Sequence, residues 1–292
     1  MITLNIKKDR EHVDIDFPCT EKVLSDALKK IGVQDAMDTK QIVSEVVNFD
    51  ALSLLEGQQV DLDEINYLAK RLDSFTKAEL DKFSVVVKMN GYDNPKDLIN
   101  LTFNGQRYTL IQNIGDMTAV GRMHTLTREI AIPADNSKDA EYAKIGWELI
   151  ESGKGHWTEK GLLFINEDIP EEEIYNGGIF PAYDYDGNCL LGIEISFLNK
   201  KVYVYLPCEE MAIKKSLTRL GVENTNHCEL RVDFDCISNN RLANLLFDKV
   251  PSENIYDINA LAYAIDEIDD YCNRYYKDIM NEQDETSQMV MG

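Results

Sequence analysis

The sequence lacks the segments that mark membrane and secreted proteins. It has no run of about 18 consecutive apolar residues, and its first residues, MITLNIKKDREH, contain no apolar stretch of the kind that signal peptides carry. Its six cysteines form no C-x-x-C pair and lie among apolar neighbours, which favours reduced core thiols. These absences predict a soluble, cytoplasmic chain without a membrane partner.

Motifs for catalysis and cofactor binding are also missing. There is no G-x-x-x-x-G-K-[ST] loop, no G-x-G-x-x-G after a strand, no H-E-x-x-H and no G-x-S-x-G. The four histidines lie far apart, and none has a partner at metal-ligand spacing. We therefore expect no enzyme activity, no cofactor and no metal.

Two pairs of carboxylates resemble parts of a site. Asp184 and Asp186 open a D-x-D pattern like that of a calcium loop, but Gly187 arrives two positions too early, so a polar turn is the better interpretation. Asp233 and Asp235 share one face of a predicted strand, as a general acid and base would. Solvated strand residues are the commoner explanation of such a pair.

Basic residues are scarce relative to acidic ones. The chain has 30 Lys and Arg against 52 Asp and Glu, a net charge of -22. The excess is -6 over residues 1–100, -8 over 101–190 and -8 over 191–292, so it belongs to folded surfaces and not to one acidic tail. Such a charge repels nucleic acid and attracts basic partners, among which DNA-binding grooves are prominent. Solubility alone is the simpler alternative.

An internal repeat is the strongest pattern in the sequence. Residues 13–33 align without gaps, at an offset of 189, with residues 202–222. A Pro-Cys pair, a leucine and a closing Gly-Val coincide in the two segments. The match resumes in the I-N-x-L-A segments at residues 65–69 and 258–262. Two copies of one unit therefore flank a central region.

Each copy predicts a strand, a helix that ends at a glycine, and a helical hairpin. In the first copy, alternation predicts a strand over 13–17, and the following helix ends at Gly32. Residues 61–89 read as the hairpin, whose second helix begins with a capping box at Thr76 and Glu79. Its counterpart is expected at residues 255–280.

The central region predicts further elements. A short helix is expected at 95–101, a strand at 108–111, a helix at 140–151 and a strand at 161–165, with an acidic connector at 166–178. The predicted class is α+β, with several small domains in an elongated array, antiparallel sheets with packed helices and helical hairpins, and internal duplication. The expected domains are 1–60 (first α/β unit), 61–115 (helical hairpin region), 116–188 (central α/β domain) and 189–292 (second α/β unit with its hairpin).

The order of these motifs resembles the ArdA antirestriction proteins, especially the variants on mobile elements of Gram-positive bacteria. The similarity rests on the strand, Pro and helix at 13–33, the hairpin at 65–89, the segment YAKIGWEL at 142–149 and GLLF at 161–164. It covers roughly residues 1–170. The copy at 190–285 looks like a second amino-terminal portion.

The resemblance implies an elongated, usually dimeric DNA mimic that occupies the DNA groove of a type I restriction–modification enzyme. We thus expect a DNA-binding defence enzyme as partner, no direct contact with nucleic acid, and a possible homodimer. The expected partner-binding surface consists of acids on the predicted hairpins and connector: Asp61, Asp63, Glu64, Asp73, Asp81, Glu171, Glu172, Glu173, Asp266, Glu267, Asp269 and Asp270. Alternatives are an acidic scaffold or adaptor for a basic protein, an inhibitor of another defence nuclease such as a CRISPR effector, and an enzyme that uses carboxylates within 116–188.

Overall fold

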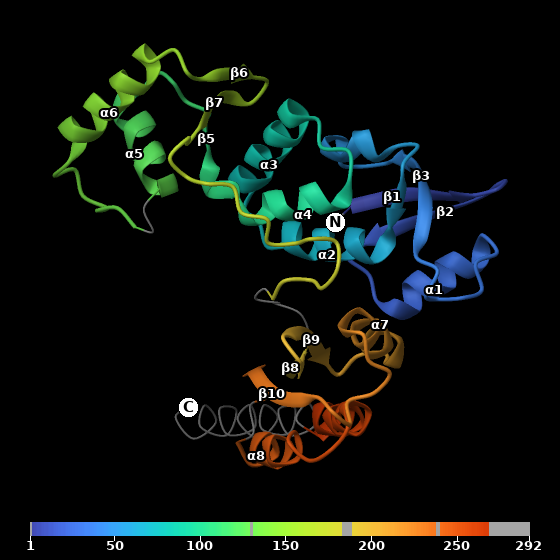
Figure 1. The fold of residues 1–292 in the computed structure, drawn as a ribbon. Helices are drawn as coiled ribbons and strands as arrows, with labels where there is room; N and C mark the ends of the chain where they lie inside the picture. Colours follow the sequence, from blue (N-terminus) through green and yellow to red (C-terminus); the bar gives the residue numbers. More distant parts are fainter. Residues whose placement is uncertain (1, 129–130, 183–188, 238–239, 269–292) are drawn as a thin grey trace, which may run out of the picture. The chain divides into compact units, whose positions relative to one another are not determined.

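The computed structural model describes residues 2–128, 131–182, 189–237 and 240–268 (Figure 1). The chain divides into two compact units, Met1–Gly177 and Gly178–Gly292. Three small antiparallel sheets with packed helices occur in the described ranges, which confirms the predicted α+β class. Within these ranges no helix is both long enough and apolar enough to cross a membrane.

The first unit begins with a four-stranded sheet in the order β2-β1-β3-β4. Its strands are β1 (Ile2–Lys8), β2 (Glu11–Phe17), β3 (Lys40–Val46) and β4 (Gln59–Asp61). Alternate residues of β2, namely Val13, Ile15 and Phe17, are buried, so the predicted strand is confirmed. Helix α1 (Glu21–Lys30) packs on β2 through its buried leucines, and Gly32 follows it with a φ of 78°.

A group of helices follows the first sheet. They are the 3₁₀ turn η1 (Asp50–Leu55), α2 (Leu62–Asp73), α3 (Lys77–Asn90), α4 (Pro95–Phe103) and the 3₁₀ turn η2 (Gly105–Arg107). Helices α2 and α3 both lie in the segment predicted as a hairpin, but α2 packs mainly against α4, so the prediction that these two helices pack on each other is wrong. The predicted capping box is present, because Thr76 Oγ1 accepts from the Glu79 N–H while the Glu79 carboxylate accepts from the Thr76 N–H at 2.7 Å. In Figure 1 these helices lie between the first sheet and the next one.

The rest of the first unit is a small sheet with a helical hairpin. The sheet has the order β5-β7-β6, with β5 (Tyr108–Ile111), β6 (His156–Thr158) and β7 (Gly161–Ile165). The hairpin consists of α5 (Met117–Arg128) and α6 (Asp139–Glu151), which lie side by side in Figure 1. The strands at 108–111 and 161–165 and the helix at 140–151 match the sequence prediction, whereas α5 and β6 were not predicted.

Helices α5 and α6 approach each other backbone to backbone. A Cβ atom added at Gly146 would lie 2.1 Å from the carbonyl oxygen of Met117, and one added at Gly121 would lie 1.8 Å from that of Tyr142. Real Cβ atoms do not tolerate such distances. Only glycine at these two positions therefore permits this crossing.

The second unit repeats the start of the first. Its sheet has the order β10-β8-β9, with β8 (Leu191–Phe197), β9 (Lys200–Leu206) and β10 (Glu229–Asp235). Its helices are α7 (Glu210–Leu220), α8 (Asn240–Lys249) and one at residues 255–268. In both units the first strand is central and pairs antiparallel with the second and third strands. The second helix of the hairpin expected at 255–280 lies outside the described residues.

One asparagine in each copy clamps the turn between the second strand and the next helix. The Asn66 side chain accepts a bond from the Cys19 N–H at 2.8 Å and donates to the Cys19 carbonyl at 2.9 Å. Asn259 makes the same two bonds with Cys208, at 3.0 and 2.8 Å. Both asparagines are more than nine-tenths buried, and a cis proline precedes the cysteine in each copy. The repeat inferred from the sequence is thus a repeat of tertiary contacts.

The cysteines differ from the sequence expectation in their burial. None of the five that the structure describes forms a disulfide, but only Cys189 is buried and Cys236 is exposed. Cys19 and Cys208 occupy the clamped turn, where their backbone groups and not their thiols make the contacts described above. The prediction of core thiols therefore fits Cys189 and, in part, Cys208 and Cys228, which pack against the core of the second unit, and is wrong for Cys236.

We predict that Asn66→Ala lowers the free energy of unfolding by about 2–3 kcal/mol, because two hydrogen bonds to partly buried backbone groups are lost. Urea unfolding followed by circular dichroism measures the effect. Asn136→Ala serves as the control, since this exposed asparagine makes only a 3.4 Å side-chain contact with Arg122. Equal stability of the two variants would contradict a structural role for the clamp.

We also predict that Gly146→Ala separates α5 from α6. Although alanine favours helix formation by about 1 kcal/mol, the clash with the Met117 backbone costs more than this gain. Amide hydrogen exchange across α5 and α6 should become faster. Gly115→Ala is the matched control, because a Cβ there would meet no atom closer than 3.4 Å, and its exchange rates should stay unchanged.

Candidate partner-binding acidic surface

The acids predicted at the start of α2 support the local fold. Asp61 is the N-cap of this helix and accepts hydrogen bonds from Thr39 Oγ1 at 2.8 Å and the Asp63 N–H at 2.9 Å. Glu64 accepts a bond of 2.8 Å from the hydroxyl of Tyr175, whose ring is fully buried. Asp61, Asp63 and Glu64 are each partly buried. They lie together in space, and the contacts of Asp61 and Glu64 hold the unit together.

The acidic connector is attached along α4 and is not a loose loop. Asn104, the C-cap residue of α4, donates to the Glu172 carbonyl at 2.9 Å and accepts from the Glu172 N–H at 3.0 Å. Asn100 of α4 holds the following residues of the connector. Its side-chain oxygen accepts hydrogen bonds from the N–H groups of Ile174 and Tyr175, at 2.9 and 2.8 Å. Two asparagines on one helix face thus fix the path of residues 172–175.

Four of the five carboxylates in this connector (166–178) face cations, among them Glu167 beside Lys154 and Asp168 beside Arg128. Glu171 forms an ion pair with Arg107, and Glu173 forms one with Lys96 at 2.5 Å. Both glutamates remain more than half exposed, so these pairs are solvent-screened and weak. Most of the negative charge predicted for this segment nevertheless lies beside a cation of the same unit.

Asp81 on α3 is the most firmly held of the predicted acids. It pairs with Lys160, which precedes β7, and accepts a bond of 3.0 Å from Gln112. Its side chain is only 16% exposed, and the hydrogen bond from Lys160 lowers its pKa below the ordinary value of 3.8. Asp81 therefore joins α3 to the β5-β7-β6 sheet.

The remaining predicted acids do not form one group. Asp73 is exposed at the far end of α2, whereas Asp266 and Glu267 belong to the second unit, where Asp266 is partly buried and Glu267 exposed. Asp269 and Asp270 lie outside the described residues, as do Asp184 and Asp186 of the calcium-like loop.

The structure reveals an acidic sheet face that the sequence prediction missed. Asp14 and Asp16 of β2 point away from the core on the outer face of the first sheet, and Glu45 of β3 is also exposed. Asn5 of β1 pairs with Asp14 on one side and with Glu45 on the other. Asp14, Asn5 and Glu45 therefore form a row across the three strands. We call Asp14, Asp16 and Glu45 the acidic sheet face. Their alternation with Val13, Ile15 and Phe17 is a sequence signal that could have identified the two aspartates.

Neutral donors hold the aspartates of the acidic sheet face. Asn5 Nδ2 donates to Asp14 and Thr3 Oγ1 donates to Asp16, each at 2.6 Å. In the part of the chain that the structure describes, no lysine or arginine forms an ion pair with Asp14, Asp16 or Glu45. The two aspartates are therefore oriented by neutral donors and not by cations, which leaves the field of this face available to a partner.

The second copy has replaced this face. Where β1 and β2 pair Asn5 with Asp14, β8 and β9 pair Glu194 with Tyr203. Glu194 also pairs with Arg231 of β10. In the first sheet the corresponding pair is Asn5 with Glu45 of β3. Glu194 is also bonded to Lys201 at 2.9 Å. The acidic sheet face is consequently a property of the first copy alone.

The described residues offer little for catalysis. No group of three or more His, Cys, Asp or Glu within them is arranged to hold a metal ion. His124 is partly buried beside Arg128, and burial lowers its pKa. Asp233 and Asp235, the possible acid and base, are both exposed on β10.

Two comparisons with known proteins found no relative of this chain. No protein-family model matches the chain, and no curated protein sequence matches it.

We predict that Asp81→Asn lowers stability by about 1 kcal/mol near neutral pH. Because the folded-state pKa of Asp81 is depressed, its stabilisation is present above its ordinary pKa and is lost as the pH falls through the lowered value. The difference from the wild type should therefore vanish in acid. Urea titrations from pH 7 to pH 3 measure it, with the exposed Asp93→Asn as control. A difference that persists undiminished at pH 3 would contradict the ion-pair origin.

Proposed function

We propose that the protein is a non-catalytic, cytoplasmic inhibitor that presents carboxylates in place of DNA phosphates to a DNA-binding defence enzyme. The resemblance of its sequence to ArdA proteins favours a type I restriction–modification complex as the target. The inhibitor needs no cofactor. It acts through contacts with the enzyme, as a monomer or homodimer, and binds neither nucleic acid nor a membrane.

The charge of each unit supports this proposal. The unit Met1–Gly177 has 20 basic and 32 acidic residues, a net of -12, and Gly178–Gly292 has 10 and 20, a net of -10. Duplex DNA carries one charge per about 1.7 Å of axis, so these values match roughly 20 Å and 17 Å of duplex. Each unit alone thus carries the charge of about half a helical turn of DNA.

The observation that carries the proposal is the acidic sheet face. Its two aspartates are oriented by Asn5 and Thr3, and no cation neutralises them among the described residues. A basic groove that approaches this face would gain attraction without first breaking internal ion pairs. Such attraction accelerates association and is screened by salt, as for DNA itself.

Two related functions fit the same charge. An inhibitor of another defence nuclease, such as a CRISPR effector, would use the same surface. An acidic scaffold or adaptor would bind a basic protein without replacing DNA. Competition separates the scaffold from the mimic, because a mimic and DNA cannot occupy the enzyme at the same time.

We predict that the triple variant D14N/D16N/E45Q weakens inhibition about tenfold at low ionic strength, because each exposed charge contributes about 0.2–1 kcal/mol. Each single change should cost at most about fivefold on the same basis. DNA cleavage by a purified type I enzyme, measured over a series of inhibitor and salt concentrations, gives the inhibition constants. The difference from the wild type should shrink as salt increases.

The triple variant E141Q/E148Q/E151Q is the matched control, since it removes the same number of exposed carboxylates from α6, away from the sheet but in the same unit. Its inhibition constant should change less than that of the sheet variant. Equal loss in both variants would show that the acidic sheet face is not the contact surface. Simultaneous binding of DNA and the protein to the enzyme would contradict mimicry altogether.

A further inference from the structure

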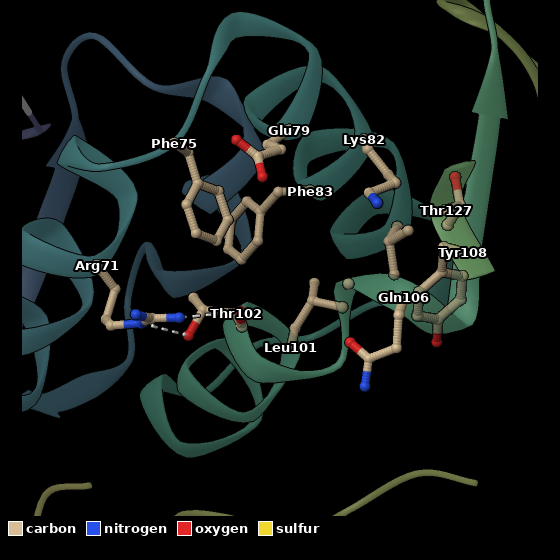
Figure 2. Close-up of a pocket in the computed structure, with 12 residues that line it drawn as sticks. Arg71, Phe75, Glu79, Lys82, Phe83, Leu101, Thr102, Gln106, Tyr108 and Thr127 are labelled. Atoms are coloured by element: carbon tan, nitrogen blue, oxygen red, sulfur yellow. Dashed lines mark hydrogen bonds between the residues drawn. The ribbon is translucent and has the colours of Figure 1, made fainter. Parts of the chain in front are cut away.

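A cavity of about 370 Å³ opens among α2, α3, α4 and β5 of the first unit (Figure 2). Its lining combines two cations, Arg71 and Lys82, with the rings of Phe75, Phe83 and Tyr108. In Figure 2 the rings of Phe75 and Phe83 lie between the guanidinium of Arg71 and the ammonium of Lys82. The cavity is independent of the acidic sheet face, and its chemistry is opposite in sign.

Arg71 is held in a fixed position at one end of the cavity. Its guanidinium lies 4.2 Å from the ring centroid of Phe103 and 5.9 Å from that of Phe75. It also donates to the hydroxyl and carbonyl oxygens of Thr102, at 3.3 and 3.2 Å. Stacking and hydrogen bonding leave this side chain little freedom, so its charge is preorganised.

Lys82 lies at the other end, where its ammonium is partly buried. A Cβ atom added at Gly105 would be 3.8 Å from Lys82 Nζ, which places the ammonium against the start of η2. No described residue accepts a hydrogen bond from this ammonium or forms an ion pair with it. Burial lowers the Lys82 pKa, because the ammonium loses hydration and no contact with a described residue compensates for that loss.

The one acid in the lining does not neutralise Lys82 by contact. The Glu79 carboxylate instead accepts bonds of 2.7 Å from the N–H and the hydroxyl of Thr76, in the capping box of α3. With Arg71, Lys82 and Glu79 as its charged residues, the cavity has a formal net charge of +1. In a chain of net charge -22, such a positive interior is a local exception.

The apolar part of the cavity suits a planar group. Phe75 and Phe83 meet edge to face with centroids 6.5 Å apart, and Phe83 is 3% exposed. Leu101 and Tyr108, each 5% exposed, complete the wall. Ligand sites of this kind hold an apolar body against aromatic side chains and fix its orientation with a few polar groups.

We infer that this cavity binds a small organic anion, in which a planar ring carries a phosphate or carboxylate group. The ring lies against Phe75 and Phe83, and the anionic group accepts hydrogen bonds from Lys82. A volume of 370 Å³ falls at the lower end of the range of about 300–1,000 Å³ for small-molecule sites, so the ligand is no larger than a mononucleotide. Binding gives the Lys82 ammonium the partner that it lacks.

Isothermal titration calorimetry of the full chain with phenyl phosphate tests this site. Phenyl phosphate should bind at one site, while inorganic phosphate and phenol, which each supply half of the ligand, should bind at least tenfold more weakly. A parallel titration with benzoate distinguishes a phosphate site from a carboxylate site. Absence of saturable binding by both phenyl phosphate and benzoate would overturn the inference.

Three variants assign the binding to Lys82. Lys82→Met should weaken the preferred probe at least tenfold, whereas Lys82→Arg, which keeps the charge, should stay within about threefold of the wild type. Lys77→Met is the matched control, because it removes the same charge from an exposed position of the same helix. Circular dichroism verifies that each variant is folded. Equal affinity of Lys82→Met and Lys77→Met would overturn the assignment, even if the probe binds.

Discussion

The duplicated fold depends on a buried asparagine that bonds to both backbone groups of a cysteine far away in the chain. Asn66 reaches back 47 residues to Cys19, and Asn259 reaches back 51 residues to Cys208. The segments in between differ, since the first copy contains η1 and β4 and the second contains α8. Because the two bonds persist despite this difference, the clamp is the constraint that fixes how the sheet and the later helix meet in both copies.

Because the asparagine holds the sheet and the helix together in both copies, the side chains on the outer face of the sheet can differ between the copies. Asp14 and Tyr203 occupy equivalent positions, yet one is a charged acceptor and the other an aromatic ring bonded to Glu194. Buried residues on the opposite face keep their apolar character in both copies, because they form the two cores. Duplication thus preserved the core while the surface of each copy acquired its own chemistry.

Net charge alone does not reveal which acids are available to a partner. In the middle of the first unit, Asp81, Glu171 and Glu173 are each paired with a cation, so part of their field is balanced within the chain. Conversely, Lys82 makes no ion pair with any described residue despite the large acidic excess. The molecule therefore combines an acidic exterior with at least one cationic interior site, and each attracts ligands of opposite sign.

Patterns within about 20 neighbouring residues were sufficient to predict most elements. The alternation before Pro18 and the Thr76 capping box depend on neighbouring residues, and the strand and the start of α3 followed from them. The duplication followed instead from a comparison of two distant segments of the sequence. Contacts between distant segments decided the rest. The pairing of Arg107 with Glu171, the approach of Gly146 to Met117 and the cavity around Lys82 join residues that no local period connects, because packing in three dimensions brings them together.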